Sequence, residues 1–131
     1  MREADPDKQG MSTQSALAIL ATLLAALATG VATLTPVAAL PAVGGSDKLH
    51  HMLAFTVLAL PVALLRPRWM LQTALALALY GGLIELVQPF VGRSRDLMDW
   101  LANLAGIATG SLTGLALRLL LRRTPAPDLT R

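Results

Sequence analysis

Residues 97–121 read LMDWLANLAGIATGSLTGLALRLLL, and this stretch decides the fold. It opens with the polar residues Asp99 and Asn103, continues with apolar and small residues, and meets a basic residue only at Arg118. At about 1.5 Å of rise per residue, a helix of this length crosses the roughly 30 Å hydrocarbon core of a bilayer. The stretch therefore predicts a membrane-spanning helix with two polar residues near one end.

Three more apolar segments precede it, at residues 14–35, 48–65 and 70–88. Hydrophobic residues make up 54% of the chain and occur in long blocks, whereas a water-soluble domain of this size would interleave them with charge. In lipid, only helix satisfies the backbone polar groups of segments spaced like these. We therefore expect an all-α polytopic membrane protein, with a bundle of four transmembrane helices over residues 14–121.

The 11 basic residues are divided unevenly between the two sides of such a bundle. Only Lys48, Arg93 and Arg95 fall on one side, and the others fall on the side of the two chain ends. The positive-inside rule then predicts cytoplasmic tails at residues 1–13, expected to be disordered, and 122–131. We expect a multi-pass protein of a bacterial cell (inner) membrane. No basic patch is interleaved with aromatic residues, so no nucleic-acid partner is expected.

The first apolar segment has a competing interpretation as a cleavable signal peptide, because small residues follow it at Ala38 and Ala39. Its apolar run is longer than the usual core of a signal peptide, and acidic residues lie among the charges before it. We expect an uncleaved membrane anchor.

Polar residues gather at the same end of the last three expected helices. Residues three or four apart share a helix face. Three such pairs stand at these helix ends: Asp47 with His51, Glu85 with Gln88, and Asp99 with Asn103. Antiparallel neighbours bring all three pairs to one depth, at the outer side of the membrane. Placing polar side chains near hydrocarbon costs free energy, and such side chains usually have a bonding partner and a functional role. The pattern therefore predicts a functional site.

Glu85 has the sharpest functional signal, as an acid about one turn below the outer boundary that could donate or accept a proton. Its structural alternative is a partner for Arg93 or for the Asn103 amide. His51 could be a general base, a metal ligand, or a histidine paired with Asp47 one turn before it.

Asp99 has two interpretations, one catalytic and one structural. The spacing Asp96-x-x-Asp99 is typical of a capping box at a helix start, and Asp47 could likewise be only a helix cap. Arg93 beside Ser94 could hold a phosphate or carboxylate through its guanidinium. Its structural alternatives are a lipid headgroup anchor and a salt bridge to Glu85 or Asp99. His51, Glu85 and Asp99 could supply three metal ligands, but no dedicated ligand spacing exists and no metal is expected.

The glycines Gly106, Gly110 and Gly114 follow each other at every fourth position of residues 97–121. Such small residues on one face let two helix backbones approach closely in lipid. We expect this face to pack within the bundle, or equally to form a homo-oligomer.

Together these motifs resemble the VanZ-like family, whose name comes from a protein linked to teicoplanin resistance. The resemblance covers roughly residues 47–114 and rests on Asp47-Lys48-x-x-His51-x-x-x-Phe55, on Glu85-x-x-Gln88, and on Gly92-Arg93-Ser94-x-x-x-x-Asp99-x-x-x-Asn103-x-x-Gly106-x-x-x-Gly110. It implies a small multi-span membrane protein without an assigned activity. The implied motif positions are Asp47, Lys48, His51, Glu85, Gln88, Arg93, Ser94, Asp99 and Asn103, whereas Asp96 and Trp100 stand at variable positions.

Two functions remain open from the sequence. The first is a cell-envelope protein, connected with glycopeptide (teicoplanin) susceptibility, that binds a lipid, a glycopeptide or another membrane protein at the outer leaflet. The second is a membrane enzyme on a lipid-linked envelope precursor, in which Glu85 or His51 transfers a proton and Asp99 orients the site. Substrate binding then falls to Asp47, Lys48, Gln88, Arg93, Ser94 and Asn103. The cofactor, if any, stays unknown.

Overall fold

The computed structural model describes residues 12–36 and 46–123, and this part of the chain contains helices and no strand. The long helices are α1 (Thr13–Leu34), α2 (Asp47–Leu65), α3 (Met70–Val87) and α4 (Leu97–Arg123). Two short 3₁₀ helices flank α3, η3 (Pro67–Trp69) before it and η4 (Gln88–Val91) after it. Four segments of the described chain are long and apolar enough to cross a membrane, and the expected all-α architecture is confirmed.

The helix ends follow local sequence signals. Ser46, and not Asp47, caps α2, because its side chain accepts a hydrogen bond from the backbone N–H of Leu49 at 3.3 Å. The α-helical part of α3 stops at Val87, just before the Gln88-Pro89 step that disfavours helix. The expected tails, residues 1–13 and 122–131, overlap the helix ends slightly. Thr13 is the first residue of α1, and Arg122 and Arg123 are the last residues of α4. Their remaining residues, and residues 37–39, lie outside the described chain.

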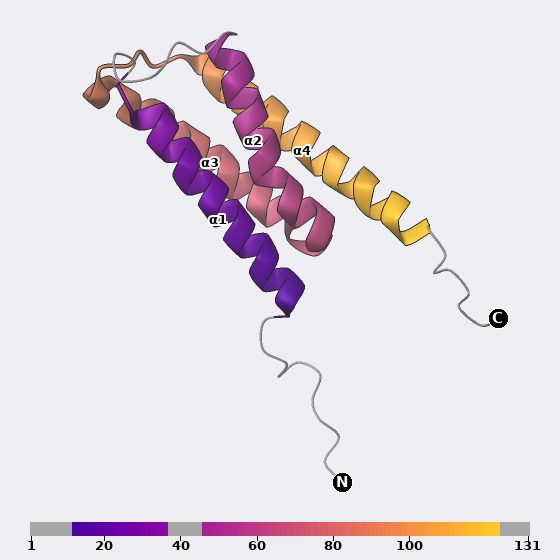
Figure 1. Ribbon diagram of the computed structural model, residues 1–131. Coiled ribbons are helices and arrows are strands. Elements are labelled where there is room, and N and C mark those ends of the chain that lie inside the picture. The colour runs from indigo at the N-terminus through magenta and orange to yellow at the C-terminus, as the bar shows by residue number, and fades with distance from the viewer. Residues whose placement is uncertain (1–11, 37–45, 124–131) are drawn as a thin grey trace, which may run out of the picture.

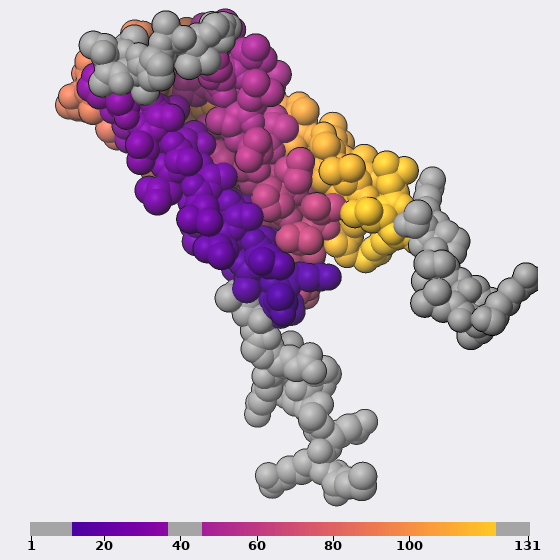
Figure 2. Space-filling model, viewed as in Figure 1, coloured from indigo at the N-terminus to yellow at the C-terminus, as the bar shows by residue number. Residues whose placement is uncertain are grey.

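Helix α2 contacts all three other long helices and packs most closely against α4. The start of α2, the end of α3 and the start of α4 lie at the same end of the bundle, opposite the start of α1 and the end of α4 (Figure 1). Helix α1 runs along one face of the bundle (Figure 2). This arrangement brings the three polar helix ends together.

Glycines let α4 lie directly on the backbone of α2. A Cβ added at Gly106 would overlap the carbonyl oxygen of Met52, and one at Gly110 would overlap that of Thr56. A Cβ at Gly114 would come within 2.8 Å of the Leu60 carbonyl oxygen. The glycine face is therefore covered by α2, and a second copy of the chain would have to use another surface.

The core is small and the outer surface is rich in leucine. Phe55, Leu58 and Ile107 belong to the buried cluster, whereas leucines such as Leu79 are largely exposed, in this case by 72%. Side chains of this kind suit contact with lipid tails, which are as apolar as leucine itself. The tight packing of the bundle therefore comes from small residues and polar contacts more than from a large apolar core.

Candidate functional site

The polar end of the bundle buries most of the residues singled out from the sequence. His51, Glu85, Gln88, Asp99 and Asn103 are each exposed by 4% or less. Charged residues at the rim surround them, and we call the whole set the polar cluster: Asp47, Lys48, His51, Glu85, Gln88, Arg93, Asp96, Asp99 and Asn103. The polar side chains at the ends of α2, α3 and α4 thus come together, as the sequence predicts.

His51 lies at the centre of the cluster and joins α2 to α4. Its Nδ1 atom is 3.0 Å from Oδ1 of Asn103, at hydrogen-bond distance. Its Nε2 atom is 4.0 Å from Oδ2 of Asp99, which is too long for a hydrogen bond. Of the interpretations of His51, a hydrogen bond to Asp47 is not formed in the described chain, and the imidazole pairs with Asn103 on the neighbouring helix.

Lys48 ties the rim of the cluster to α4. Its Nζ atom is 2.9 Å from Oδ2 of Asp96 and 3.5 Å from Oδ1 of Asp99. The Lys48 ammonium, followed by the backbone N–H of Met98, holds the pKa of the Asp96 carboxyl below its ordinary value of 3.8. The Asp96 carboxyl is therefore ionised at neutral pH.

Arg93 forms the second ion pair at the rim of the cluster. Its Nη2 atom lies 3.2 Å from Oδ2 of Asp47, and its Nη1 atom donates to the backbone oxygen of Thr35 at 3.5 Å. The salt-bridge interpretation of Arg93 named Glu85 or Asp99 as the partner, whereas the carboxylate that Arg93 reaches is that of Asp47. Ser94 is exposed and makes no hydrogen bond within residues 12–36 and 46–123.

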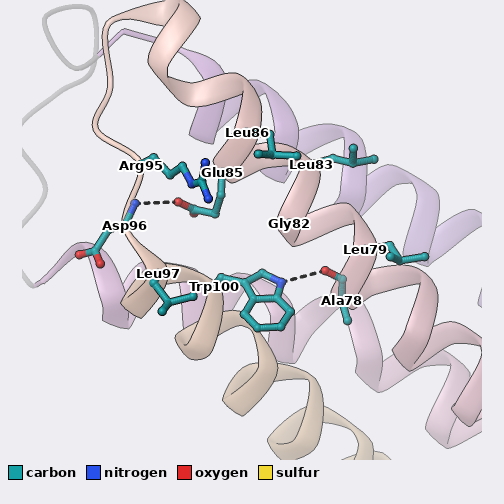
Figure 3. Close-up of a pocket in the computed structure, with 10 residues that line it drawn as sticks. All are labelled: Ala78, Leu79, Gly82, Leu83, Glu85, Leu86, Arg95, Asp96, Leu97 and Trp100. Atoms are coloured by element: carbon teal, nitrogen blue, oxygen red, sulfur yellow. Dashed lines mark hydrogen bonds between the residues drawn. The ribbon is translucent and has the colours of Figure 1, made fainter.

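Glu85 reaches across from α3 to the start of α4. Its Oε2 atom accepts the backbone N–H of Asp96 at 3.0 Å (Figure 3). Oδ1 of Asp96 in turn accepts the N–H of Met98 at 2.8 Å. The capping-box interpretation of Asp99 requires its carboxylate to accept the Asp96 N–H, and the structure does not have this bond among the described residues. Glu85 takes that acceptor role from another helix, and Asp99 turns toward Lys48 and His51 instead.

Several buried polar atoms of the cluster keep no hydrogen-bond partner in the described chain. Gln88 donates from Nε2 to the backbone oxygen of Thr33 at 3.5 Å, but its Oε1 has no partner. The others are His51 Nε2, Glu85 Oε1, Asp99 Oδ1 and Asn103 Nδ2. Each such group costs about 1–3 kcal/mol, so this concentration points to a place where a ligand or water is bound.

A pocket of about 580 Å³ opens beside the cluster, between α3 and α4 (Figure 3). Its wall is apolar, and Glu85, Arg95 and Asp96 form its polar end. The Trp100 indole lines the pocket and donates from Nε1 to the backbone oxygen of Ala78 at 3.0 Å. Asp96 and Trp100 stand at variable positions of the family motifs, so the sequence did not point to this pocket. An indole in an otherwise aliphatic segment was the available signal, because a buried indole N–H needs an acceptor.

Metal ligands converge in a different set from the one considered above. One ligand atom each from Asp47, His51 and Asp99 lie within 4.8 Å of one another. Glu85, which the sequence grouped with His51 and Asp99, is held by the backbone of Asp96 instead.

These features define a multi-pass, all-α membrane protein with a buried acid, amide and imidazole cluster at one end of its bundle. Residues 8–120 match the family model VanZ/LLP1, and the chain belongs to this family. The resemblance drawn from the motifs at residues 47–114 is thereby confirmed over most of the chain. No curated protein and no solved structure matches it.

Proposed function

We propose that this VanZ/LLP1 protein acts in the cell envelope by binding an amphiphilic envelope lipid beside the polar cluster, at the outer side of the membrane. The observation that supports the proposal is the pocket between α3 and α4, whose apolar wall ends at a buried carboxylate. A pocket of about 580 Å³ accommodates part of a lipid chain.

The chemistry of the two ends of the pocket matches the two ends of a lipid. The leucines Leu79, Leu83 and Leu86 offer an apolar wall to a hydrocarbon chain. At the polar end, Glu85 keeps Oε1 free to accept a hydrogen bond from a headgroup hydroxyl or amine. Arg95 lines the same end and suits a phosphate or carboxylate. The proposed ligand therefore combines an apolar chain with a headgroup that carries both a hydrogen-bond donor for Glu85 and an anionic group for Arg95.

The distribution of basic residues supports the outer location of the cluster. Arg66 and Arg68 lie in the connection at the opposite end of the bundle, and Arg118 donates to the Leu64 backbone oxygen near that end. The positive-inside rule places that end in the cytoplasm. The headgroup would then belong to the outer leaflet, where envelope precursors and glycopeptides such as teicoplanin are encountered.

The side of the membrane is tested with single cysteines, because the natural chain has none. We expect Ser94→Cys to react with a membrane-impermeant maleimide on intact cells, and Arg68→Cys to react only after the membrane is opened. Both positions are exposed, so access to the side chain is comparable. The reverse labelling pattern would place the polar cluster in the cytoplasm and overturn this part of the proposal.

Binding is tested by blocking the pocket. A Cβ at Gly82 would meet only Trp100, at 3.5 Å, so Gly82→Leu fills the pocket without displacing a helix backbone. We expect this variant to lose the lipid that co-purifies with the wild type in native mass spectrometry, and to lose any effect on teicoplanin susceptibility. Leu112→Phe, an exposed change elsewhere on α4, serves as the control. Equal lipid retention by all three proteins would contradict lipid binding in the pocket.

Glu85→Gln separates binding from proton chemistry. The amide oxygen of glutamine can still accept the Asp96 N–H, so a binding protein tolerates the change. If the variant accumulates normally in the membrane but the cellular effect disappears, the Glu85 carboxylate is needed for proton transfer. The protein would then be an enzyme on a lipid-linked substrate.

A further inference from the structure

We propose that Asp47, His51 and Asp99 form a binding site for a divalent transition-metal ion, with Zn²⁺ as the best match. The site uses the α2 and α4 side of the polar cluster, whereas the lipid pocket lies between α3 and α4. Metal binding therefore does not depend on the lipid binding proposed above.

The spacing of the ligand atoms fits one ion shared between them. His51 Nε2 and Asp99 Oδ2 are 4.0 Å apart, too far for a hydrogen bond. Two ligands on one Zn²⁺, each about 2.0–2.2 Å from the metal, lie roughly 3–4 Å apart. An Asp47 carboxylate oxygen completes a set whose members all lie within 4.8 Å of one another.

The hydrogen bond on the far side of the imidazole prepares His51 as a ligand. The Asn103 side-chain oxygen can only accept, so in neutral His51 the proton sits on Nδ1 and the Nε2 atom carries a lone pair. That lone pair faces the Asp99 carboxylate, which repels it unless a cation lies between them. Metal-bound histidines commonly donate their other N–H to an oxygen in this way. The His51 side chain is only 2% exposed, and its Nε2 atom has no hydrogen-bond partner in the described chain. A bound metal ion would be the partner of this atom.

The neighbouring cations leave room for an ion. Lys48 approaches Oδ1 of Asp99, and Oδ2 remains directed at His51. Arg93 contacts Asp47 from the rim, where the Asp47 side chain is 54% exposed and each carboxylate oxygen has further lone pairs. The ion pairs next to the site join the acids Asp47, Asp96 and Asp99 to the bases Lys48 and Arg93, so one negative charge is left to attract a further cation.

The donor set selects among metals. One imidazole nitrogen with two carboxylate oxygens suits Zn²⁺ and similar transition metals, whereas Mg²⁺ and Ca²⁺ prefer all-oxygen sites. Three protein ligands leave a fourth position for water or for an anionic group. The site is therefore proposed for Zn²⁺ and not for Mg²⁺.

The experiment uses the full-length protein, purified with an affinity tag that contains no histidine, stripped with a chelator and titrated with Zn²⁺. We expect one Zn²⁺ per chain by elemental analysis and calorimetry, without comparable binding of Mg²⁺. His51→Ala and the isosteric Asp99→Asn should each weaken Zn²⁺ binding by at least about tenfold. His50→Ala is the matched control, since His50 is the only other histidine of the chain and is not one of the three ligands.

Two results would overturn the metal site. The first is wild-type Zn²⁺ binding no stronger than that of folded Asp99→Asn, with folding checked by circular dichroism and gel filtration. The second is an NMR signature of a doubly protonated His51 that Zn²⁺ does not change, which would make His51 the cationic partner of Asp99. Gly82→Leu should still bind Zn²⁺, so failure of the lipid proposal and failure of the metal proposal give different patterns.

Discussion

One face of α4 changes character halfway along the helix. Its first part presents Asp99 and Asn103, and its continuation, which begins three residues later, presents Gly106, Gly110 and Gly114 at four-residue spacing. The first two side chains meet polar side chains of α2, whereas the three glycines meet the α2 backbone itself. Position along the bundle, and not the spacing, therefore decides whether this face forms a site or a packing seam.

The two halves support each other physically. The glycines hold α4 so close to α2 that Asn103 can reach His51 at 3.0 Å. Polar partners at the end of the seam in turn fix how far α4 slides along α2, because a buried polar group without its partner costs free energy. Substitutions in the seam should therefore damage the fold, and substitutions in the polar half should damage binding first.

The largest expected effect comes from a bulky residue in the seam. Gly110→Leu places a side chain where the Thr56 carbonyl oxygen lies, so the two helices must separate. We expect a loss of about 3 kcal/mol or more in the free energy of unfolding. Thermal unfolding of the detergent-solubilised protein, together with its abundance in the membrane, measures this loss.

Gly82→Leu is the matched control, because the same change is made at a glycine that borders the lipid pocket and not the α2 backbone. Its melting temperature should stay near that of the wild type. Equal destabilisation by the two variants would mean that the seam is no more sensitive than the pocket, and the contrast between the halves would fail.

A smaller loss is expected in the polar half. Asn103→Ala removes the partner of His51 Nδ1 and leaves that buried atom without a hydrogen bond, which costs about 1–3 kcal/mol. Thr109→Ala is the comparison on the same helix, because the exposed Thr109 hydroxyl bonds only to the Ala105 backbone oxygen of its own helix. In denaturation curves, Asn103→Ala should unfold at a lower denaturant concentration than Thr109→Ala. Coincident curves would show that the contact between Asn103 and His51 contributes nothing to stability.

The helices and the meeting of their polar ends could be predicted from the sequence. Apolar run length sets the spans, and the 3.6-residue period sets which side chains share a face. These rules predict that residues such as Glu85 and Asn103 lie at one end of the bundle, as they do in the structure. Antiparallel packing then requires α2, α3 and α4 to meet there. These are local rules, and they do not depend on how the helices rotate against one another.

The individual partners could not be predicted, because each depends on helix rotation and side-chain reach. Arg93 and Asp47 are 46 positions apart, and no local spacing selects this pair over Arg93 with Glu85. The Asp99 carboxylate could accept the free Asp96 N–H at the start of its own helix, or it could face α2. Glu85 from α3 already accepts that N–H, so Asp99 faces α2. The pocket behind Trp100 was missed for the same reason, since it forms between two helices.

A further prediction concerns the wall shared by the pocket and the cluster. Trp100→Phe keeps the ring volume in part but removes the hydrogen bond to the Ala78 backbone oxygen, which should cost about 0.5–1.5 kcal/mol. Trp69→Phe is the control, because the Trp69 indole makes no hydrogen bond to another helix in the described chain. The melting temperature of Trp100→Phe should fall below that of Trp69→Phe, and the opposite order would place the stabilising indole at Trp69.

The smallest effect is expected at the rim, where Asp96 meets Lys48 in contact with solvent. The pKa of Asp96 is lowered in the folded protein, so the native state favours the ionised carboxylate over the unfolded chain. This contribution to stability is present above the ordinary value of 3.8 and is lost as the pH falls through the lowered pKa. Asp96→Asn keeps an acceptor for the Met98 N–H and removes only the charge.

Melting temperatures of the wild type and Asp96→Asn should therefore differ slightly at neutral pH and converge in acid. The effect is small because both side chains are largely exposed and water screens their attraction. Added salt should shrink the neutral-pH difference further, since exposed charges are the ones that salt screens best. A difference that persists unchanged into acid would mean that the substitution acts through something other than the charge of Asp96, and that the rim, unlike the buried half of the cluster, gains nothing from its charge.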